Sequence, residues 1–278
     1  GVDHPDVLGT VNNLGKLAST QGKSEEATTL YKRALNGLDR NLGVEHPDAT
    51  STANNLAVVL IQQKKYQEAE TLLVRVLNSV IRIHGEEHLK TLSALRGLAF
   101  VKKQSNQILE ALALFTRELG ICEKMLPPDH PDIYRSALDV AIIHQNLGEF
   151  IIAEAELRKI FLFRRSTLGM GHRDTLRVAY YLASVLFELK SYDEAKYLAE
   201  ATHAGFVALS TESSPDSLAS KRLSDLCDRG IQERESKKRR GSAESATKAG
   251  DIMVINNTAT LSTTAGDNNI DNNSPDNQ

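Results

Sequence analysis

Apolar residues recur along this chain at the spacing of amphipathic helices that come in pairs. In the first helix of the first pair, the i, i+3, i+4 and i+7 positions are apolar or small: Val11, Leu14, Gly15 and Ala18. The same spacing returns over residues 27–38, after a short polar turn at residues 21–23. This pattern predicts an antiparallel helical hairpin.

The hairpin pattern repeats every 42 residues. One column of the repeat holds only alanine: Ala27, Ala69, Ala111, Ala153 and Ala195. Another holds Leu14, Leu56, Leu98, Val140 and Leu182. A supersecondary unit repeated at a fixed period predicts an all-α solenoid and not a single globular core.

We expect three parts in this chain. Residues 1–210 are predicted to form five helical hairpins of 42 residues, and residues 211–240 a degenerate sixth unit that acts as a capping helix. Residues 241–278 are rich in Ser, Thr, Asn and Asp, so we expect a disordered polar tail there. Because no unit precedes the first one, the outer apolar surface of unit one is expected to be exposed or covered by sequence outside this chain.

A His-Pro-Asp triplet or a degenerate copy of it opens each unit. Complete copies begin at His4, His46 and His130. Proline suits the first position of a helix, and an acidic residue in the first turn favours the positive end of the helix dipole. Glycines lie a few residues earlier and can end the preceding helix: Gly1, Gly43, Gly85 and Gly169. The triplet therefore marks where one unit stops and the next begins.

The recurring histidines do not predict a metal site. Packed helices lie about 8–10 Å apart, whereas zinc ligands must each approach the ion to about 2.0–2.1 Å. We therefore expect these histidines to structure the loops. The sequence also contains no glycine-rich phosphate loop and no motif typical of a nucleophile with its base, so we expect neither catalysis nor a cofactor.

Composition adds limits on location and partners. The net charge of −3 does not indicate a general nucleic-acid binder, and no apolar run is long enough to span a membrane. Two cysteines, Cys122 and Cys227, fall in apolar columns, as expected for core residues in a reducing compartment such as the cytoplasm. One basic run could be a nuclear import signal or contact an acidic partner, although the soluble end of a charged helix explains it better: Lys237, Lys238, Arg239 and Arg240.

The column residues resemble the tetratricopeptide repeat (TPR) pattern, notably Leu14-Gly15, Ala18, Ala27, Tyr31 and Ala34. The 42-residue period, the His-Pro-Asp triplet and the Asn pairs at 12–13 and 54–55 are similar to kinesin light chain repeats. Arrays of similar period also form the sensor arms of STAND-class NTPases. Unit three departs from the pattern, since Arg96-Gly97 replaces the Asn pair.

The resemblance implies a right-handed solenoid whose first helices line a concave groove. Asparagines there could bond a peptide backbone, and apolar side chains could form pockets. The implied groove positions are Asn12, Asn13, Lys16, Asn54, Asn55, Val58, Gln62, Arg96, Phe100, Leu138, Ile142 and Tyr180. Two alternatives remain: Asn13 and Asn55 could bond neighbouring helices instead, and Phe100 and Ile142 could pack between units.

These observations together predict a non-catalytic protein–protein interaction module that binds a peptide or partner segment. One alternative is a regulatory arm of a STAND-type NTPase whose nucleotide-binding domain lies outside this chain. A weaker alternative is nucleic-acid or acidic-partner binding through residues 237–240. The chain begins at a glycine inside a repeat start, so we expect a fragment or a processed product.

Overall fold

The computed structural model describes residues 4–209 and 214–262, and the side chains among them up to residue 240. All regular structure in these residues is helical. The helices are α1 (Pro5–Thr20), α2 (Ser24–Leu42), α3 (Pro47–Gln62), α4 (Tyr66–His84), α5 (Leu89–Gln104), α6 (Ile108–Met125), α7 (Pro131–Asn146), α8 (Phe150–Leu168), α9 (Arg173–Glu188), α10 (Tyr192–Leu209) and α11 (Pro215–Ser262).

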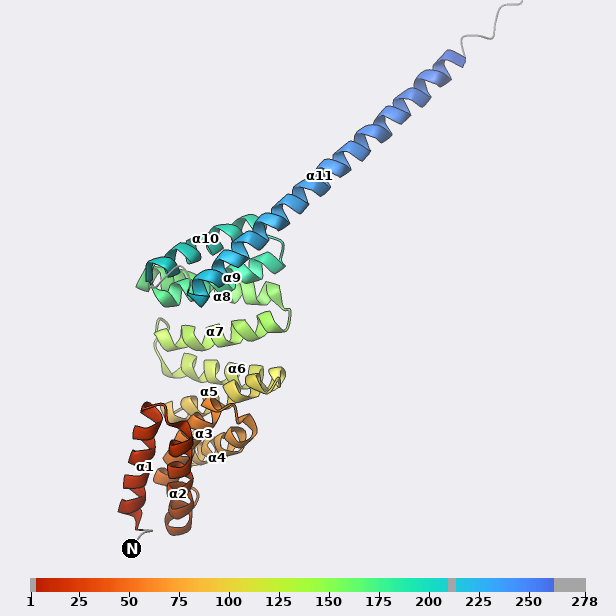
Figure 1. Ribbon diagram of the computed structural model, residues 1–278. Helices are drawn as coiled ribbons and strands as arrows, with labels where there is room; N and C mark the ends of the chain where they lie inside the picture. The colour runs from red at the N-terminus through yellow and green to blue at the C-terminus, as the bar shows by residue number, and fades with distance from the viewer. Residues whose placement is uncertain (1–3, 210–213, 263–278) are drawn as a thin grey trace, which may run out of the picture.

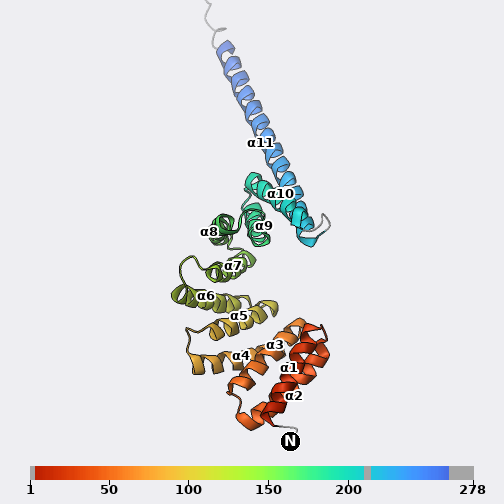
Figure 2. The same cartoon turned by 90° about the vertical axis from the view of Figure 1, so that its left-hand side faces the viewer.

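The helices pair into hairpins that stack one on the next, which confirms the predicted all-α solenoid (Figure 1). We call the hairpins units one to five, and α11 unit six. In each unit the odd-numbered helix is the first helix and the even-numbered helix is the second. Each first helix packs against the second helix of its own unit and of the unit before it. α11 packs against α9 and α10 and then extends beyond the array (Figure 2).

The histidine that opens each unit caps the first helix. Nδ1 of His46 accepts a hydrogen bond of 3.2 Å from the backbone N–H of Asp48. The same bond, at 3.1 to 3.3 Å, recurs at the other four starts, at His4, His88, His130 and His172. A side chain that accepts from the second helical N–H satisfies one of the orphan donors of a helix N-terminus. The predicted loop role of these histidines is therefore helix capping.

Three of the four glycines before the triplets end the second helices as predicted, and Gly1 lies outside the described residues. Gly43, Gly85 and Gly169 have φ between 82° and 89°, a left-handed conformation that only glycine adopts at little cost. The third junction has no such glycine. There α6 ends at Met125 and extended Leu126 leads into two prolines, which cannot continue a helix.

Alanine fills the tightest positions of the solenoid. All five residues of the alanine column have no solvent-accessible surface: Ala27, Ala69, Ala111, Ala153 and Ala195. The leucine and valine column that starts at Leu56 is also buried. Close approach of helices leaves no room for larger side chains at such positions, so the repeat is held by small residues facing large ones.

The two ends of the array differ from its middle. Leu14 and Leu17 on α1 are 49% and 53% exposed, although the equivalent Leu56 and Val59 on α3 are buried against α2. The expected exposure of the outer apolar surface of unit one is therefore found.

At the other end, α11 continues to Ser262, past residue 240, which is the predicted end of the capping helix. Residues 241–249 contain mainly Ser, Ala, Glu and Lys and no proline, so nothing in them stops a helix. The part of the predicted disordered tail over residues 241–262 thus differs from the structure, and residues 263–278 lie outside the described residues.

We predict that Ala111→Leu destabilises the array, because the added methylenes have no space among Ala99, Phe115, Val140 and Ile143. Overpacking of this kind costs about 1–3 kcal/mol, so the thermal midpoint measured by circular dichroism should fall. The matched control is Leu109→Ala in the same helix, where the side chain is exposed. An unchanged midpoint for Ala111→Leu would contradict the packing described here.

Candidate functional site

The odd-numbered helices α1, α3, α5, α7 and α9 follow one another along one side of the array and form one surface, which we call the first-helix face. At the junction of two units this face contains a recess bounded by two first helices and the second helix between them. The recesses at three junctions share one lining position, which is Leu38 in unit one, Val80 in unit two and Phe206 in unit five. The recess is thus a feature of the repeat itself, and its contents vary from unit to unit.

The recess between α3, α4 and α5 is open and largely apolar. It has a volume of about 340 Å³. Val76 and Val80 lie at its base, and Ile83 and Leu89 form part of its rim, 42% and 60% exposed. Its remaining lining residues are Pro47, Thr50, Ser51, Asn54, His84, Lys90 and Ser93.

Short side chains explain why this recess is open. The positions of Val76 and Val80 carry Glu118 and Cys122 in unit three, and Ile160 and Arg164 in unit four. Thr50, which also lines the recess, stands in a column where units one, three and five have buried leucines at 8, 92 and 176. Side chains that reach less far leave space between the helices that no other residue fills.

The recess carries little charge. The pKa of His84 is lowered by desolvation and further by the neighbouring Lys90 and His88, so the imidazole is neutral at physiological pH. His84 stacks on His88 with the ring centroids 4.4 Å apart, and Nζ of Lys90 lies 3.3 Å from Nε2 of His84. Lys90 is thus the single charged residue among those that line this recess.

The recess between α1 and α3 is polar instead. Its lining includes Asn12, Asn13, Ser51 and Asp48. Asn55 Nδ2 donates a long hydrogen bond of 3.4 Å to Asn12 Oδ1, which joins the two first helices. This bond is the helix-to-helix alternative that the sequence left open for Asn55, whereas the side chain of Asn13 is exposed.

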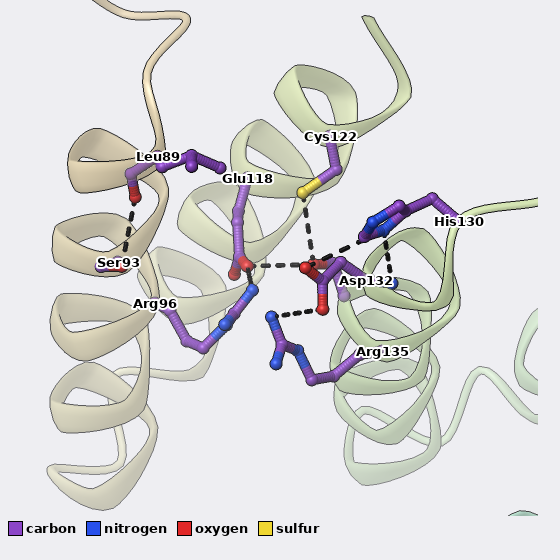
Figure 3. A network of polar contacts seen from close by, with 9 residues as sticks. Leu89, Ser93, Arg96, Glu118, Cys122, His130, Asp132 and Arg135 are labelled. Atoms are coloured by element: carbon purple, nitrogen blue, oxygen red, sulfur yellow. Dashed lines mark hydrogen bonds and ion pairs between the residues drawn. The ribbon is translucent and has the colours of Figure 1, made fainter. Parts of the chain in front are cut away.

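A polar network fills the corresponding place between α5 and α7 (Figure 3). Glu118 on α6 has no accessible surface and pairs with Arg96 on α5. Its Oε1 also accepts a 2.9 Å hydrogen bond from the Ser136 hydroxyl on α7, and Ser136 Oγ lies 3.7 Å from Cys122 Sγ. Burial raises the pKa of Glu118, and the nearby Arg96 guanidinium opposes but does not cancel that effect.

Side chains also fill most of the space at the junction of units four and five and at the junction of units five and six. Arg164 of α8 is mostly buried and lies 3.7 Å from the carboxylate of Asp174. Tyr180 borders a small recess between α9 and α11 together with Tyr181 and Phe206. Its pKa is raised, first by burial and then by the neighbouring Tyr181 and Asp216. The open part of the first-helix face therefore lies over units one to three.

The predicted groove residues fall into three groups by exposure. Five are exposed: Asn13, Lys16, Val58, Gln62 and Phe100. Five are partly buried: Asn12, Asn54, Asn55, Arg96 and Tyr180. Leu138 and Ile142 are buried in the core of units four to six, so they pack between helices, which is the alternative reading the sequence left for Ile142.

Sequence reasoning missed the residues that make the open recess. Thr50, Val76, Val80 and Ile83 each look like ordinary members of a helical repeat. Comparison along the columns could have found Thr50 and Val80, because most other units have a larger side chain at these two positions. The same comparison marks Glu118, since its column otherwise holds Ala34, Val76, Ile160 and Thr202.

Two family models, both described as tetratricopeptide repeat, match residues 7–48 and 48–124. Residues 7–124, less than half of the chain, are thus similar to the tetratricopeptide repeat family. The helical hairpins that follow have the same period and the same fold. No curated protein matches the chain.

Solved structures place the fold among known TPR arrays. The nearly identical TPR-like repeats of a predicted kinesin light chain from Podosopora anserina are 25% identical, with a TM-score of 0.65 over 74% of this chain and 98% of that one. BtubC (BKLC) from P. vanneervenii is 23% identical, with a TM-score of 0.55 over 60% of this chain and 66% of that one.

The STAND protein with a TPR sensor from Pyrococcus horikoshii is 16% identical, with a TM-score of 0.59. The match covers 80% of this chain and 31% of that protein. These similarities agree with the predicted resemblance to kinesin light chain repeats and to STAND sensor arms.

In the part of the chain that the structure describes, no helix is both long and apolar enough to cross a membrane. No group of three or more His, Cys, Asp or Glu residues there is arranged to hold a metal ion.

We predict a specific pH dependence from Glu118. Because its pKa is raised in the folded state, the fold favours the protonated form, and ionisation of this group lowers the stability as the pH rises. The stability of the native protein relative to Glu118→Gln should therefore fall as the pH rises above the ordinary value of 4.5 for this carboxyl. Thermal unfolding of both proteins from that pH to neutral pH measures the difference.

The control for this experiment is Glu188→Gln, at an exposed position of α9. If the difference between Glu118→Gln and the native protein is the same at every pH, the raised pKa is wrong.

Proposed function

We propose that this TPR array binds an extended segment of a partner protein along its first-helix face, with an uncharged apolar side chain of the partner in the recess between α3, α4 and α5. TPR arrays are protein–protein interaction modules, and the matched family gives that general role. The finer proposal concerns where the partner lies and what chemistry it offers.

The open recess is the observation that carries the proposal. It combines apolar residues at its base and rim with volume that the protein does not fill. Exposed Ile83 and Leu89 meet water in the free protein, and covering them gains about 25 cal/mol per Å² of apolar surface. Val58 and Phe100 add exposed apolar surface to the same face.

The polar groups near the recess suit a peptide backbone. Ser51, Asn54 and Ser93 lie at its edge, and a side-chain amide both donates and accepts hydrogen bonds. Asn12 and Asn13 offer the same groups at the neighbouring recess. A segment that follows the face from α3 to α1 would meet Asn54 first and then Asn12 and Asn13. These amides could bind its backbone whatever its side chains are.

Other properties support binding over catalysis. The polar side chains of the recess are one amide, three hydroxyls, a neutral imidazole and the Lys90 ammonium. They can recognise a ligand but do not form the nucleophile and base set that would transform it. Both cysteines are free and buried. Their free thiols are consistent with the proposed cytoplasmic location.

The test is selection of peptides on the native chain. Peptides enriched from a random 12-residue display library should lose affinity for Ile83→Asp about tenfold or more, because the variant places an unpaired charge where an apolar side chain should bind. Fluorescence polarisation of the labelled peptides measures the dissociation constants.

The matched control is Thr167→Asp, the same column of the repeat in unit four, where the residue is also exposed. Enriched peptides should bind this variant as they bind the native chain. Equal loss of affinity in both variants, or in neither, would count against the recess as the binding site.

We also predict that Asn13→Ala combined with Asn55→Ala weakens binding of the same peptides while leaving helical content unchanged. Asn13 is exposed and Asn55 is partly buried in its bond to Asn12, so neither supports the apolar core. Peptide affinity and far-ultraviolet circular dichroism are the two measurements. An affinity that stays the same would remove the asparagines from the proposed site.

A further inference from the structure

The apolar core of the array is interrupted between units three and four. One cluster of buried residues extends through units one to three and reaches into unit four only at Ile133, the first buried residue of α7. A second cluster begins at Leu138 and runs to Cys227 in unit six. The residues between them form a separate small cluster: Ala99, Ala111, Phe115, Val140 and Ile143. The other junctions lie inside one continuous cluster.

The first helices also lie farther apart at this junction than at the others. Elsewhere, successive first helices have Cα atoms within 8 Å of each other: α1 and α3, α3 and α5, α7 and α9, and α9 and α11. No such pair joins α5 to α7. Figure 1 shows the stack continuing through α6 at this point. Units three and four therefore hold together mainly through α6 and α7.

Ion pairs reinforce every other junction. Examples are Arg75 with Asp39 between units one and two, Lys102 with Glu70 between two and three, Arg158 with Glu194 between four and five, and Lys196 with Asp228 between five and six. Among the residues whose side chains are described, no ion pair joins unit three to unit four. This junction thus lacks a type of contact that all its neighbours have.

Glu118 connects the two sides instead. Its carboxylate binds Arg96 in unit three and accepts the hydroxyl of Ser136 in unit four, but its second oxygen, Oε2, is buried without a hydrogen-bond partner. A buried carboxylate with incomplete hydrogen bonding is costly. Opening of the junction would let water reach that oxygen, so the loss of the two bonds would be offset in part by solvation.

We propose that the junction between units three and four is a hinge between two stiffer halves of the array, units one to three and units four to six, and that Glu118 holds it in the observed position. The stability of a repeat array is approximately a sum of unit and interface contributions, so the interface with the fewest contacts is the one that bends at the lowest cost. Hinge motion here changes how the open recess of unit two faces the first helices of units four and five.

Spin labels placed one repeat apart test the hinge without any ligand. The test pair is Leu109→Cys with Ile151→Cys, which spans the junction between units three and four. The control pair is Gln67→Cys with Leu109→Cys, the same column across the junction between units two and three. All three sites are exposed, and native Cys122 and Cys227 are buried.

Double electron–electron resonance gives the distance distribution of each pair. The distribution of the test pair should be wider than that of the control pair, about twofold or more, as expected for motion at a hinge. Equal widths for the two pairs would overturn the hinge. This comparison uses the otherwise native chain, so it does not depend on the folding of any variant of Glu118.

Substitution of Glu118 tests its part in the proposal. Glu118→Ala should widen or shift the distribution of the test pair and leave the control pair unchanged. Glu118→Gln keeps the shape and a partner for Ser136, so its distribution should lie nearer to the native one. A test-pair distribution that stays native in Glu118→Ala, or a change of equal size in both pairs, would overturn the role of Glu118.

Discussion

The contact on which this molecule depends is the packing of the two helices of each hairpin against each other. The alanine column lets these helices approach closely, and glycines do the same in units one and five. A Cβ added at Gly37 would lie 2.6 Å from the Leu8 side chain, and one at Gly205 would lie 2.5 Å from that of Leu176. In units one and five, a leucine of the first helix thus has a glycine opposite it. Where both members are small, as at Thr50 and Ser79 of unit two, the repeat keeps its fold but loses apolar volume.

The sequence predicts the fold well because the same residue pattern recurs in several units. Helix period, alanine column and His-Pro-Asp starts all indicate the same hairpin, and this agreement across levels identifies a fold. The surface is harder to predict. Phe100 and Ile142 occupy the same column, yet Phe100 is exposed and Ile142 is buried. Column position sets which way a side chain points, whereas its burial depends on the neighbouring unit, which differs between the two.

Charges in core columns identify the places where this array departs from a regular repeat. Glu118 and Arg164 occupy columns that elsewhere hold mostly apolar residues, in adjacent units. Both are largely removed from water, and each has a partner on another helix. Unit two shows the opposite departure, because its short apolar residues leave a recess open. The same place in three successive junctions thus contains a cavity, a buried carboxylate and a buried guanidinium.

These differences between successive junctions connect the proposed binding site to the shape of the array. The open recess belongs to the half of the array with a continuous core through units one to three, so its walls keep their spacing when the proposed hinge moves. Arg96 lies at the boundary, since it binds Glu118 and also occupies the groove column of unit three. A partner segment long enough to pass from the recess to α7 would meet Arg96 on its way. Such a segment would favour whichever hinge position gives it the better contacts, because a ligand shifts a conformational equilibrium by its difference in affinity for the two states.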